Sequence, residues 1–428
     1  MDPILQVSLD FIDLPRAIKV AKEAVAGGAD WIEAGTPLIK SCGLEAVRTL
    51  KKEFPGIPIV ADMKIMDTGR LEVEIAAKSG ADVVVVMGNA SDQTIAEAIE
   101  AGKAYGVKVV VDLMELALTP KRAKEVARLS PDYIGIHIPI DQQMSGTASY
   151  KIVEEIGAEV DIPLAVAGGI NSENIVDVIH AGASLLIVGG AITKSENATN
   201  ATIQIKEAVR SKEKISTTLF RRATSETIGE ILSKVSTANI SDAMHRHGWI
   251  PGIKPIGIVK RFFGPAITVR TLPGDWAKPV EAIDLAKPGD VIIIDVGGLP
   301  PAVWGELATY SAVEKKIAAV VIHGAIRDLE EIKETGFPAY AKEFCPQAGE
   351  PKGYGEINVA IEIEGVTVEP GDWIVGDRDG VVCIPNAKAV EMTNRAMDVL
   401  ERENRLRKEI QQGSTLSEIT ELLKWEKQ

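Results

Sequence analysis

The sequence predicts two joined domains of the α/β class, a (β/α)8 barrel followed by a separate strand-rich α/β domain. Its 428 residues exceed the length of one ordinary domain. Up to about residue 212, short β-branched runs alternate with amphipathic helical stretches. From residue 233 the strand-like runs instead come in clusters, with Pro-Gly-Asp turns at 288–290 and 370–372. This change of pattern predicts a domain boundary between the two halves.

Eight strand candidates can be counted in the first half, and helical patterns such as 91–105 and 120–129 follow them. The candidates are residues 5–9, 31–34, 59–63, 83–87, 108–113, 133–138, 164–167 and 185–188. Eight β-α units over this length favour a closed barrel. A doubly wound open sheet is the alternative, but it usually has fewer strands and a glycine-rich loop after the first strand. Here Asp10 follows the first strand.

The second half has seven strand candidates: 263–270, 291–296, 318–322, 359–363, 366–368, 372–375 and 380–384. We place the barrel at residues 1–212, a polar linker at 213–227, the second domain at 228–386 and a charged helical tail at 387–428. The tail is expected either to pack as a helix or to form an oligomer contact.

The composition indicates a soluble globular protein, with 46% hydrophobic and 25% charged residues. A net charge of -14 without a basic run argues against binding to nucleic acid or acidic lipid. The three cysteines lie far apart, which argues against a disulfide framework or thiolate zinc site and fits a reducing compartment. The first residues lack the basic region and long apolar core of a signal peptide, and no apolar run approaches the ~20 residues needed to span a bilayer. We therefore expect a cytoplasmic protein without a membrane partner.

The run 61–67, Ala-Asp-Met-Lys-Ile-Met-Asp, is the most informative motif in the chain. Asp62 and Lys64 are expected on the same face, because side chains on a strand repeat every second residue. Asp67 lies beyond the strand and is free to turn back or to reach a neighbouring subunit. A lysine held between carboxylates stays charged and suits an anionic intermediate. An isolated motif of this kind is equally typical of a surface salt-bridge cluster.

Other strand ends favour an active site over a surface cluster. Barrel active sites lie at the carboxyl ends of the strands, and the polar residues there are Asp10, Glu33, Asp62, Lys64, Asp112 and His137. Buried like charges cost several kcal/mol unless they are paired or bind a metal. Oxygen ligands from Glu33 and Asp62 suit Mg2+. His137 has the chemistry of a general acid or base, although a structural histidine is the alternative.

Glycine pairs end the seventh and eighth predicted strands, at Gly168–Gly169 and Gly189–Gly190. Backbone N–H groups at such pairs can approach a phosphate, with support from the N-termini of the following helices. Either pair alone is compatible with a tight turn. Two pairs at these two positions predict a sugar-phosphate substrate.

Together these motifs, with Glu-Ala-Gly-Thr-Pro at 33–37, resemble 3-hexulose-6-phosphate synthase of the orotidine monophosphate decarboxylase superfamily. The resemblance spans residues 1–210. It implies a reversible, Mg2+-dependent aldol reaction of formaldehyde with ribulose 5-phosphate. In the roles it implies, Glu33 and Asp62 hold the metal, Lys64 supports the enediolate charge, His137 shuttles the proton and Asp10 belongs to the catalytic set. Asp67 would enter the partner subunit's site in a dimer.

A sister activity remains open, the decarboxylation of 3-keto-L-gulonate 6-phosphate, which uses nearly the same residues. A phosphate-gripping arginine after strand eight would favour that decarboxylase, but the chain has Ala191 there. In this alternative the second domain is a non-catalytic regulatory or binding domain.

The strongest signal in the second half is the segment 324–328, Gly-Ala-Ile-Arg-Asp, after an apolar strand. Arg327 can bind a carboxylate and Asp328 a metal, although a helix N-terminal Asp with a solvent-facing Arg is the alternative. With segments 240–243, 263–268 and 297–308, it resembles the regulator of ribonuclease activity A-like family over residues 228–386. The family includes class II pyruvate aldolases and oxaloacetate decarboxylases.

This second resemblance implies a β/β/α sandwich and trimeric assembly. By the same resemblance, Arg327 would bind a pyruvyl substrate, Asp328 would bind Mg2+ or Mn2+, and Glu306 would be a carboxylate next to that metal. Members that only bind ribonuclease lack the aspartate. A pure binding module is the competing interpretation. Dimeric barrels joined to trimeric second domains would give a homo-oligomer such as a hexamer.

Overall fold

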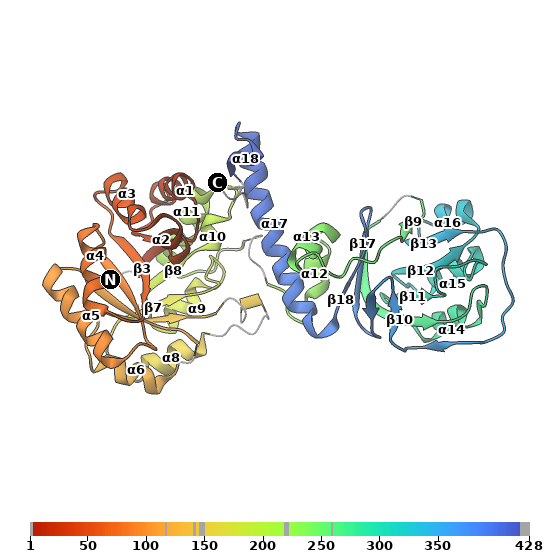
Figure 1. Cartoon of the computed structure of the whole chain (residues 1–428), viewed down its shortest axis with the longest axis horizontal. Helices are drawn as coiled ribbons and strands as arrows, with labels where there is room; N and C mark the ends of the chain where they lie inside the picture. The colour runs from red at the N-terminus through yellow and green to blue at the C-terminus, as the bar shows by residue number, and fades with distance from the viewer. Residues whose placement is uncertain are drawn as a thin grey trace. The chain divides into compact units, whose positions relative to one another are not determined.

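The computed structural model describes residues 3–115, 118–139, 143–144, 150–217, 222–257 and 260–419 (Figure 1). The chain divides into two compact units. The first comprises Met1–Gln143, Thr147–Arg221 and Glu401–Gln428, and the second comprises Met144–Gly146 and Arg222–Leu400. The domain limits placed from the sequence remain predictions. Each unit is described by itself.

The first unit contains a closed barrel in which each strand pairs in parallel with the next and β8 pairs with β1. Its strands are β1 Ile4–Leu9, β2 Trp31–Ala34, β3 Ile59–Ile65, β4 Val83–Met87, β5 Lys108–Leu113, β6 Tyr133–His137, β7 Leu164–Ala167 and β8 Ala183–Val188. The predicted (β/α)8 barrel is confirmed.

Helices connect the strands of the barrel. They are α1 Leu14–Ala26, α2 Thr36–Cys42, α3 Glu45–Glu53, α4 Gly69–Lys78, α5 Asp92–Tyr105, α6 Pro120–Ala127, α8 Lys151–Gly157, α9 Ile175–His180, α10 Gly190–Thr193 and α11 Ala198–Ser211. Several begin at side-chain caps: Asp13 accepts a hydrogen bond from the Arg16 N–H, and Ser91 accepts one from the Thr94 N–H.

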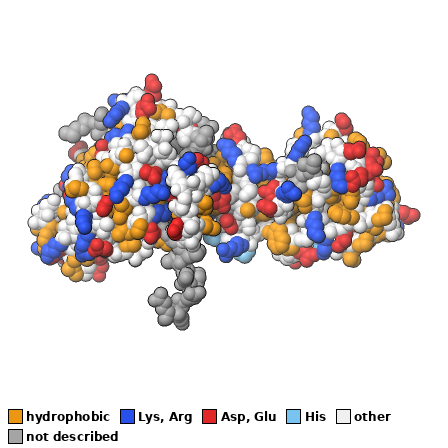
Figure 2. Space-filling model, turned by 90° about the horizontal axis from the view of Figure 1, so that it is seen from above, with side chains coloured by type: hydrophobic (Ala, Val, Ile, Leu, Met, Phe, Trp, Pro, Cys, Tyr) orange, Lys and Arg blue, Asp and Glu red, His pale blue; other side chains and the backbone are white. Residues whose placement is uncertain are grey.

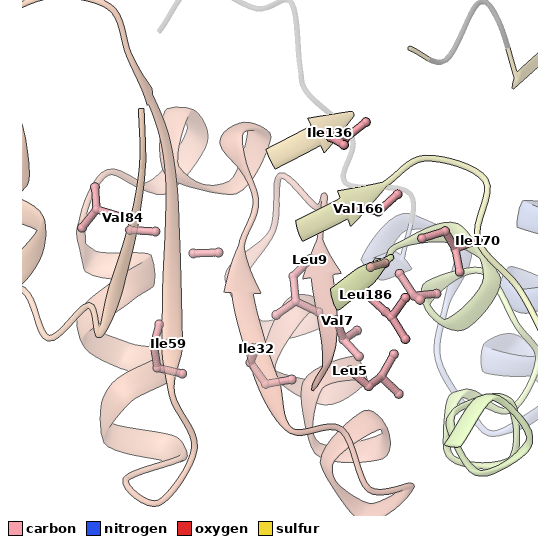
Figure 3. Close-up of a cluster of buried hydrophobic side chains, with 14 of the residues drawn as sticks. Leu5, Val7, Leu9, Ile32, Ile59, Val84, Ile136, Val166, Ile170 and Leu186 are labelled. Carbon is pink, nitrogen blue, oxygen red and sulfur yellow. The ribbon is translucent and has the colours of Figure 1, made fainter. Parts of the chain in front are cut away.

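Alternation along the strands separates two sets of buried side chains. One set contains Leu5, Val7 and Leu9 of β1 and belongs to the large cluster that also includes helix residues (Figure 3). The opposite set includes Trp31, Val60, Val110 and other apolar residues, and it fills part of the barrel interior. The carboxyl ends of the same inward-facing rows are polar, and that layer forms the candidate site.

The second unit is built on a mixed sheet of order β18-β17-β10-β11-β12-β13-β9, with β14 also paired to β10. The strands are β9 Lys254–Pro255, β10 Phe262–Arg270, β11 Val291–Asp295, β12 Ala319–Ile326, β13 Ala339–Phe344, β14 Glu356–Ile357, β17 Trp373–Asp377 and β18 Gly380–Ile384. Strands β10 to β13 are parallel, whereas the pairings of β9, β14, β17 and β18 are antiparallel.

Two layers cover this sheet, which confirms the predicted layered α/β domain. One apolar cluster joins β11 and β12 to helices α14 Ala277–Leu285, α15 Glu306–Glu314 and α16 Leu329–Thr335. Another joins the same strands to the hairpin of β15 Ile361–Ile363 and β16 Val366–Val368. Short helices α12 Ile228–Leu232 and α13 Thr237–Ala243 form a further cluster with β17 and β18.

The chain continues through η2 Asn386–Lys388, α17 Ala389–Gln411 and α18 Leu416–Ile419. None of the helices in the described ranges has the length and apolar character needed to cross a membrane. On the face shown in Figure 2, acidic and basic side chains are interspersed over both units.

Candidate functional site

The polar end of the barrel interior brings together side chains from five strands. Ser8 of β1 lies opposite Glu33 of β2 in the strand register, and Asp112 of β5 lies opposite Gly135 of β6. Asp62 of β3 and His137 of β6 complete this layer. Inward-facing residues at the carboxyl ends of barrel strands share one cavity mouth, so these side chains meet although they are far apart in sequence.

Lys64 is held between two carboxylates. Its Nζ lies 3.2 Å from Asp62 Oδ1 and 3.0 Å from Asp112 Oδ2. Burial alone would lower the pKa of Lys64, but Asp62 and Asp112 outweigh it and raise the pKa above its ordinary value. The ammonium group is therefore charged and fixed in position.

The route by which Asp62 and Lys64 meet differs from the simple alternation expected from the sequence. Between Ala61 and Ile65 the pairing of β3 shifts, so four steps along β3 match two along β4. Lys64 has a φ of 49°, in the left-handed region that non-glycine residues rarely adopt. A bulge thus re-aims the Lys64 side chain.

Glu33 is a buried carboxyl group, with 5% of the residue exposed. Ser8 Oγ donates to Glu33 Oε1 over 2.6 Å, and Gln6 Nε2 donates to Oε2. Burial, followed by the charges of Asp62 and Asp10, raises the pKa of Glu33 to about 8. In the absence of a cation this group is therefore largely protonated near neutral pH.

Asp10 and Asp62 complete the acidic cluster. Thr36 Oγ1 lies 2.7 Å from Asp62 Oδ2 and 3.0 Å from the Asp62 carbonyl oxygen. Burial and the charge of Asp62 raise the pKa of Asp10. A Cβ at Gly35 would lie 2.3 Å from Asp10 Oδ1. Glycine at this position therefore leaves room for the carboxylate.

His137 lies beside Asp112, with its Nδ1 3.6 Å from Asp112 Oδ2. Burial works to raise the pKa of Asp112, but the interactions with His137 and Lys64 lower it on balance. Its other oxygen, Oδ1, is buried and has no hydrogen-bond partner within the described part of the chain. Asp112 thus links the histidine to the lysine.

Asp67 lies beyond the end of β3, as expected, whereas one of the two glycine pairs is arranged differently from the expectation. Asp67 is exposed and accepts a hydrogen bond from the Thr68 N–H over 2.7 Å, outside the cluster around Lys64. Gly189 immediately precedes α10 and Gly190 is its first residue, as expected. Gly168 and Gly169, in contrast, are followed by a helix only at Ile175. The expected support from a helix N-terminus is therefore wrong for this pair.

The conformation after β7 nevertheless requires glycine. Gly168 and Gly169 have φ values of 108° and 68°. A Cβ at Gly168 would also lie 2.5 Å from the Ile138 carbonyl oxygen. Backbone groups at this turn can consequently come close to a ligand without an intervening side chain.

The donor set fits a divalent cation such as Mg2+. Burial and the charge of Asp62 raise the pKa values of Glu33 and Asp10, and a cation would relieve the repulsion among these carboxylates. Within the described residues, no group of three or more His, Cys, Asp or Glu side chains is arranged to hold a metal ion. Mg2+ is commonly bound by only one or two carboxylates, with water and substrate as the other ligands. Glu33 and Asp62 are suitable for that role.

The predicted residues of the second unit also lie close together. Asp328 Oδ2 accepts a hydrogen bond from the Glu306 N–H over 3.0 Å and lies 3.4 Å from Arg327 Nε. A Cβ at Gly305 would lie 2.4 Å from the same oxygen. The loop before α15 and the end of β12 therefore meet at Asp328, which has a φ of 58°.

Several polar contacts in the two units were not predicted from the sequence. In the barrel they involve Gln6, Ser8 and Thr36; polar residues at alternating positions 6, 8 and 10 of the first strand were the available signal. A further cluster that the sequence did not predict lies in the second unit, where His323 Nδ1 lies 2.7 Å from Asp295 Oδ1 and His323 Nε2 lies 3.2 Å from Glu364 Oε1. The same Glu364 oxygen lies 2.6 Å from Lys342 Nζ.

Comparison with known proteins gives one relationship for each half. Residues 3–205 match the family described as orotidine 5'-phosphate decarboxylase / HUMPS. The chain is 36% identical to 3-hexulose-6-phosphate synthase of Bacillus subtilis over 206 residues, which are 48% of this chain and 98% of that protein. The chain belongs to this family. The barrel half of the chain is therefore an enzyme.

Residues 237–383 of the chain match a second family, described as Aldolase/RraA. A solved structure of the RNA-processing inhibitor RraA from Thermus thermophilis is 31% identical, covering 36% of this chain and 93% of that chain with a TM-score of 0.34. A solved 3-hexulose-6-phosphate synthase is 36% identical and covers 49% and 99%, with a TM-score of 0.46. The chain is thus a fusion of a HUMPS-type barrel with an RraA-like domain.

Proposed function

We propose that the barrel catalyses the reversible, Mg2+-dependent aldol reaction of formaldehyde with ribulose 5-phosphate to give 3-hexulose 6-phosphate. The observation that carries this proposal is Lys64, charged and fixed between Asp62 and Asp112 beside the buried Glu33. The identity to 3-hexulose-6-phosphate synthases supports the choice of substrates.

The roles of the chain's own residues follow from this arrangement. His137 takes a proton from the sugar carbon next to the carbonyl, and Lys64 stabilises the enediolate that results. That carbon then attacks formaldehyde, and the new alkoxide receives a proton. Mg2+ bound by Glu33 and Asp62 would supply further positive charge beside the sugar oxygens. The backbone at Gly168–Gly169 and Gly189–Gly190 binds the phosphate.

Formaldehyde release from 3-hexulose 6-phosphate tests the barrel reaction. We expect release with Mg2+, loss with EDTA, and loss in Asp62→Ala. The control is Asp161→Ala, because Asp161 is exposed. If wild-type protein releases no formaldehyde, the proposal is wrong. Decarboxylation of 3-keto-L-gulonate 6-phosphate would then be measured, since that sister reaction uses nearly the same residues.

For the second unit we propose metal-dependent carbon–carbon cleavage of a pyruvyl substrate, as in pyruvate aldolases and oxaloacetate decarboxylases. Arg327 would bind the carboxylate and Asp328 would hold Mg2+ or Mn2+, with Glu306 beside the metal. The contacts of Asp328 with Arg327 and the Glu306 backbone support this arrangement.

Pyruvate formation from oxaloacetate tests this second proposal. We expect it to require Mg2+ or Mn2+ and to disappear in Asp328→Ala, whereas the exposed Asp379→Ala control should match wild type. Metal-independent capture of a protein partner without pyruvate formation would instead identify a binding module.

A further inference from the structure

The C-terminal tail carries buried charges that the proposed reactions do not use. From Glu401 onward, α17 belongs to the same compact unit as the barrel. Glu401, Arg405 and Glu409 lie four residues apart, hence on one helix face, and only 0%, 3% and 2% of these residues are exposed. Charged groups are rarely buried to this extent unless they are paired.

Arg405 is paired through every part of its guanidinium group. Its Nη1 and Nη2 each lie 2.8 Å from one oxygen of Glu23 in α1, which makes a bidentate ion pair. Its Nε donates to Glu409 Oε1 over 2.7 Å. Its Nη1 also lies 3.2 Å and 3.4 Å from the carbonyl oxygens of Ser195 and Glu196.

Those two carbonyl groups belong to the turn that leads away from the proposed phosphate-binding backbone. Gly189 precedes α10 and Gly190 begins it; the helix ends at Thr193, and Ser195 lies two residues further. A helix of four residues has little stability of its own, because the cost of helix nucleation is not recovered over one turn. The position of α10 therefore depends on what holds its two ends.

Glu23 holds the other side of the same turn. Its Oε2 accepts a hydrogen bond from the Ala198 N–H over 3.3 Å, and its carbonyl oxygen accepts one from Thr199 Oγ1 over 2.9 Å. The Glu23–Arg405 pair thus holds the end of α10 and the first turn of α11. Without Arg405, Glu23 and Glu409 would be left without this counter-charge, and the carbonyl groups of residues 195 and 196 would lose their donor.

We propose that Arg405 is a positioning residue, which holds the backbone of Gly189–Gly190 where it binds the phosphate of the substrate. This inference rests on the proposed function of the barrel. It gives the tail a role in substrate binding, whereas the sequence predicted only helix packing or an oligomer contact. A group that affects phosphate binding equally in ground and transition states changes KM and leaves kcat unchanged.

The experiment compares full-length Arg405→Gln and Arg405→Lys with the control Arg407→Gln. Arg407 is exposed on the same helix and contacts only Asn404 among the described hydrogen bonds. We expect Arg405→Gln to raise KM for ribulose 5-phosphate and the inhibition constant of inorganic phosphate roughly tenfold, with kcat and KM for formaldehyde near wild type. Arg405→Lys keeps the charge without the bidentate geometry and should show an intermediate effect.

The outcomes separate positioning from simple stabilisation. Folded Arg405→Gln with a lower Tm but unchanged constants for sugar phosphate and inorganic phosphate would overturn the proposal. If Arg405→Gln does not fold, Arg405→Lys provides the same comparison. Inactive wild-type protein would refute the proposed function instead, and the inference would then be decided by calorimetry with inorganic phosphate on wild type and Arg405→Lys.

Discussion

At the barrel mouth, acidic side chains outnumber the lysine that neutralises them. Asp62 and Asp112 share Lys64, whereas Glu33 and Asp10 have no basic side chain within hydrogen-bond distance in the described structure. Burial, followed by this excess of negative charge, raises the pKa values of Asp10 and Glu33. A proton or a cation must compensate for it, so metal binding and protonation should compete.

This competition predicts a pH-dependent stability that Mg2+ removes. The pKa of Glu33 is about 8 in the folded protein and lies near 4.5 when unfolded, so the folded state binds the extra proton between these values. In EDTA, stability should therefore fall as pH rises from about 5 to 8. Mg2+ should raise Tm more at pH 8 than at pH 5.5, because protons no longer compete with it.

Thermal unfolding of wild type and Glu33→Gln, each with EDTA or Mg2+, provides the measurement. Glu33→Gln should flatten the slope in EDTA and remove the pH dependence of the Mg2+ effect. An unchanged slope in this variant would show that another group titrates.

Lys64→Ala should lower kcat by about two powers of ten or more, because a fixed charge that stabilises an anionic transition state is lost. The variant also leaves Asp62 and Asp112 without their shared counter-ion, so Tm must be measured alongside. Lys78→Ala is the matched control, because the Lys78 side chain is 63% exposed and pairs with Glu74. A folded Lys64→Ala with wild-type kcat would exclude the assigned role.

Much of the barrel site could be read from sequence, because strand ends can be located from apolar runs and parallel strands share one active end. Glu33, Asp62 and His137 follow this rule. Ser8 and Thr36 were not predicted as site residues, because a hydroxyl group can be assigned to a site only when its partner is placed beside it. The bulge that aims Lys64 was also invisible, since it depends on the pairing of β3 with β4.

Among the elements, the strands that the sequence did not predict are β9, β13 and β14. Strands β9 and β14 have two residues each, and β13 contains Lys342 and Glu343, so their patterns are weak. Strand β12 runs to Ile326 rather than 322, through Gly324. A Cβ at Gly324 would lie 2.0 Å from Val296 Cγ2, so close packing explains a glycine that normally indicates a strand end.

The loop between β2 and α2 provides an element-scale prediction. Gly35→Ala should lower kcat/KM by at least tenfold, because its Cβ would lie 2.3 Å from Asp10 Oδ1 and 2.9 Å from the Leu9 carbonyl oxygen. Gly56→Ala is the control, since nothing lies within 4 Å of its added Cβ. The measurement is kcat/KM and Tm of both variants. A kcat/KM of Gly35→Ala equal to that of wild type would mean that Asp10 is not required in its observed position.

At the scale of the whole molecule, each unit leaves apolar side chains exposed. In the barrel, Met66, Leu71 and Ile75 of β3–α4 are 49%, 57% and 39% exposed. In the second unit, Leu307 and Tyr310 of α15 are 81% and 49% exposed. Contiguous exposed apolar residues commonly indicate interfaces. Asp67 follows Met66 directly, so a barrel dimer formed through this surface would place Asp67 near the partner.

The hexamer implied by the two resemblances stays a prediction, and six chains of 45.8 kDa would have a native mass of about 275 kDa. Leu71→Glu should break barrel pairs, leave trimers and abolish the aldol reaction, because Asp67 would no longer reach the partner's site. Leu307→Glu should leave dimers that keep this reaction. Ile203→Glu, at a residue 47% exposed on α11, is the control. Light scattering after size exclusion gives the masses, and an active Leu71→Glu trimer would exclude a shared barrel site.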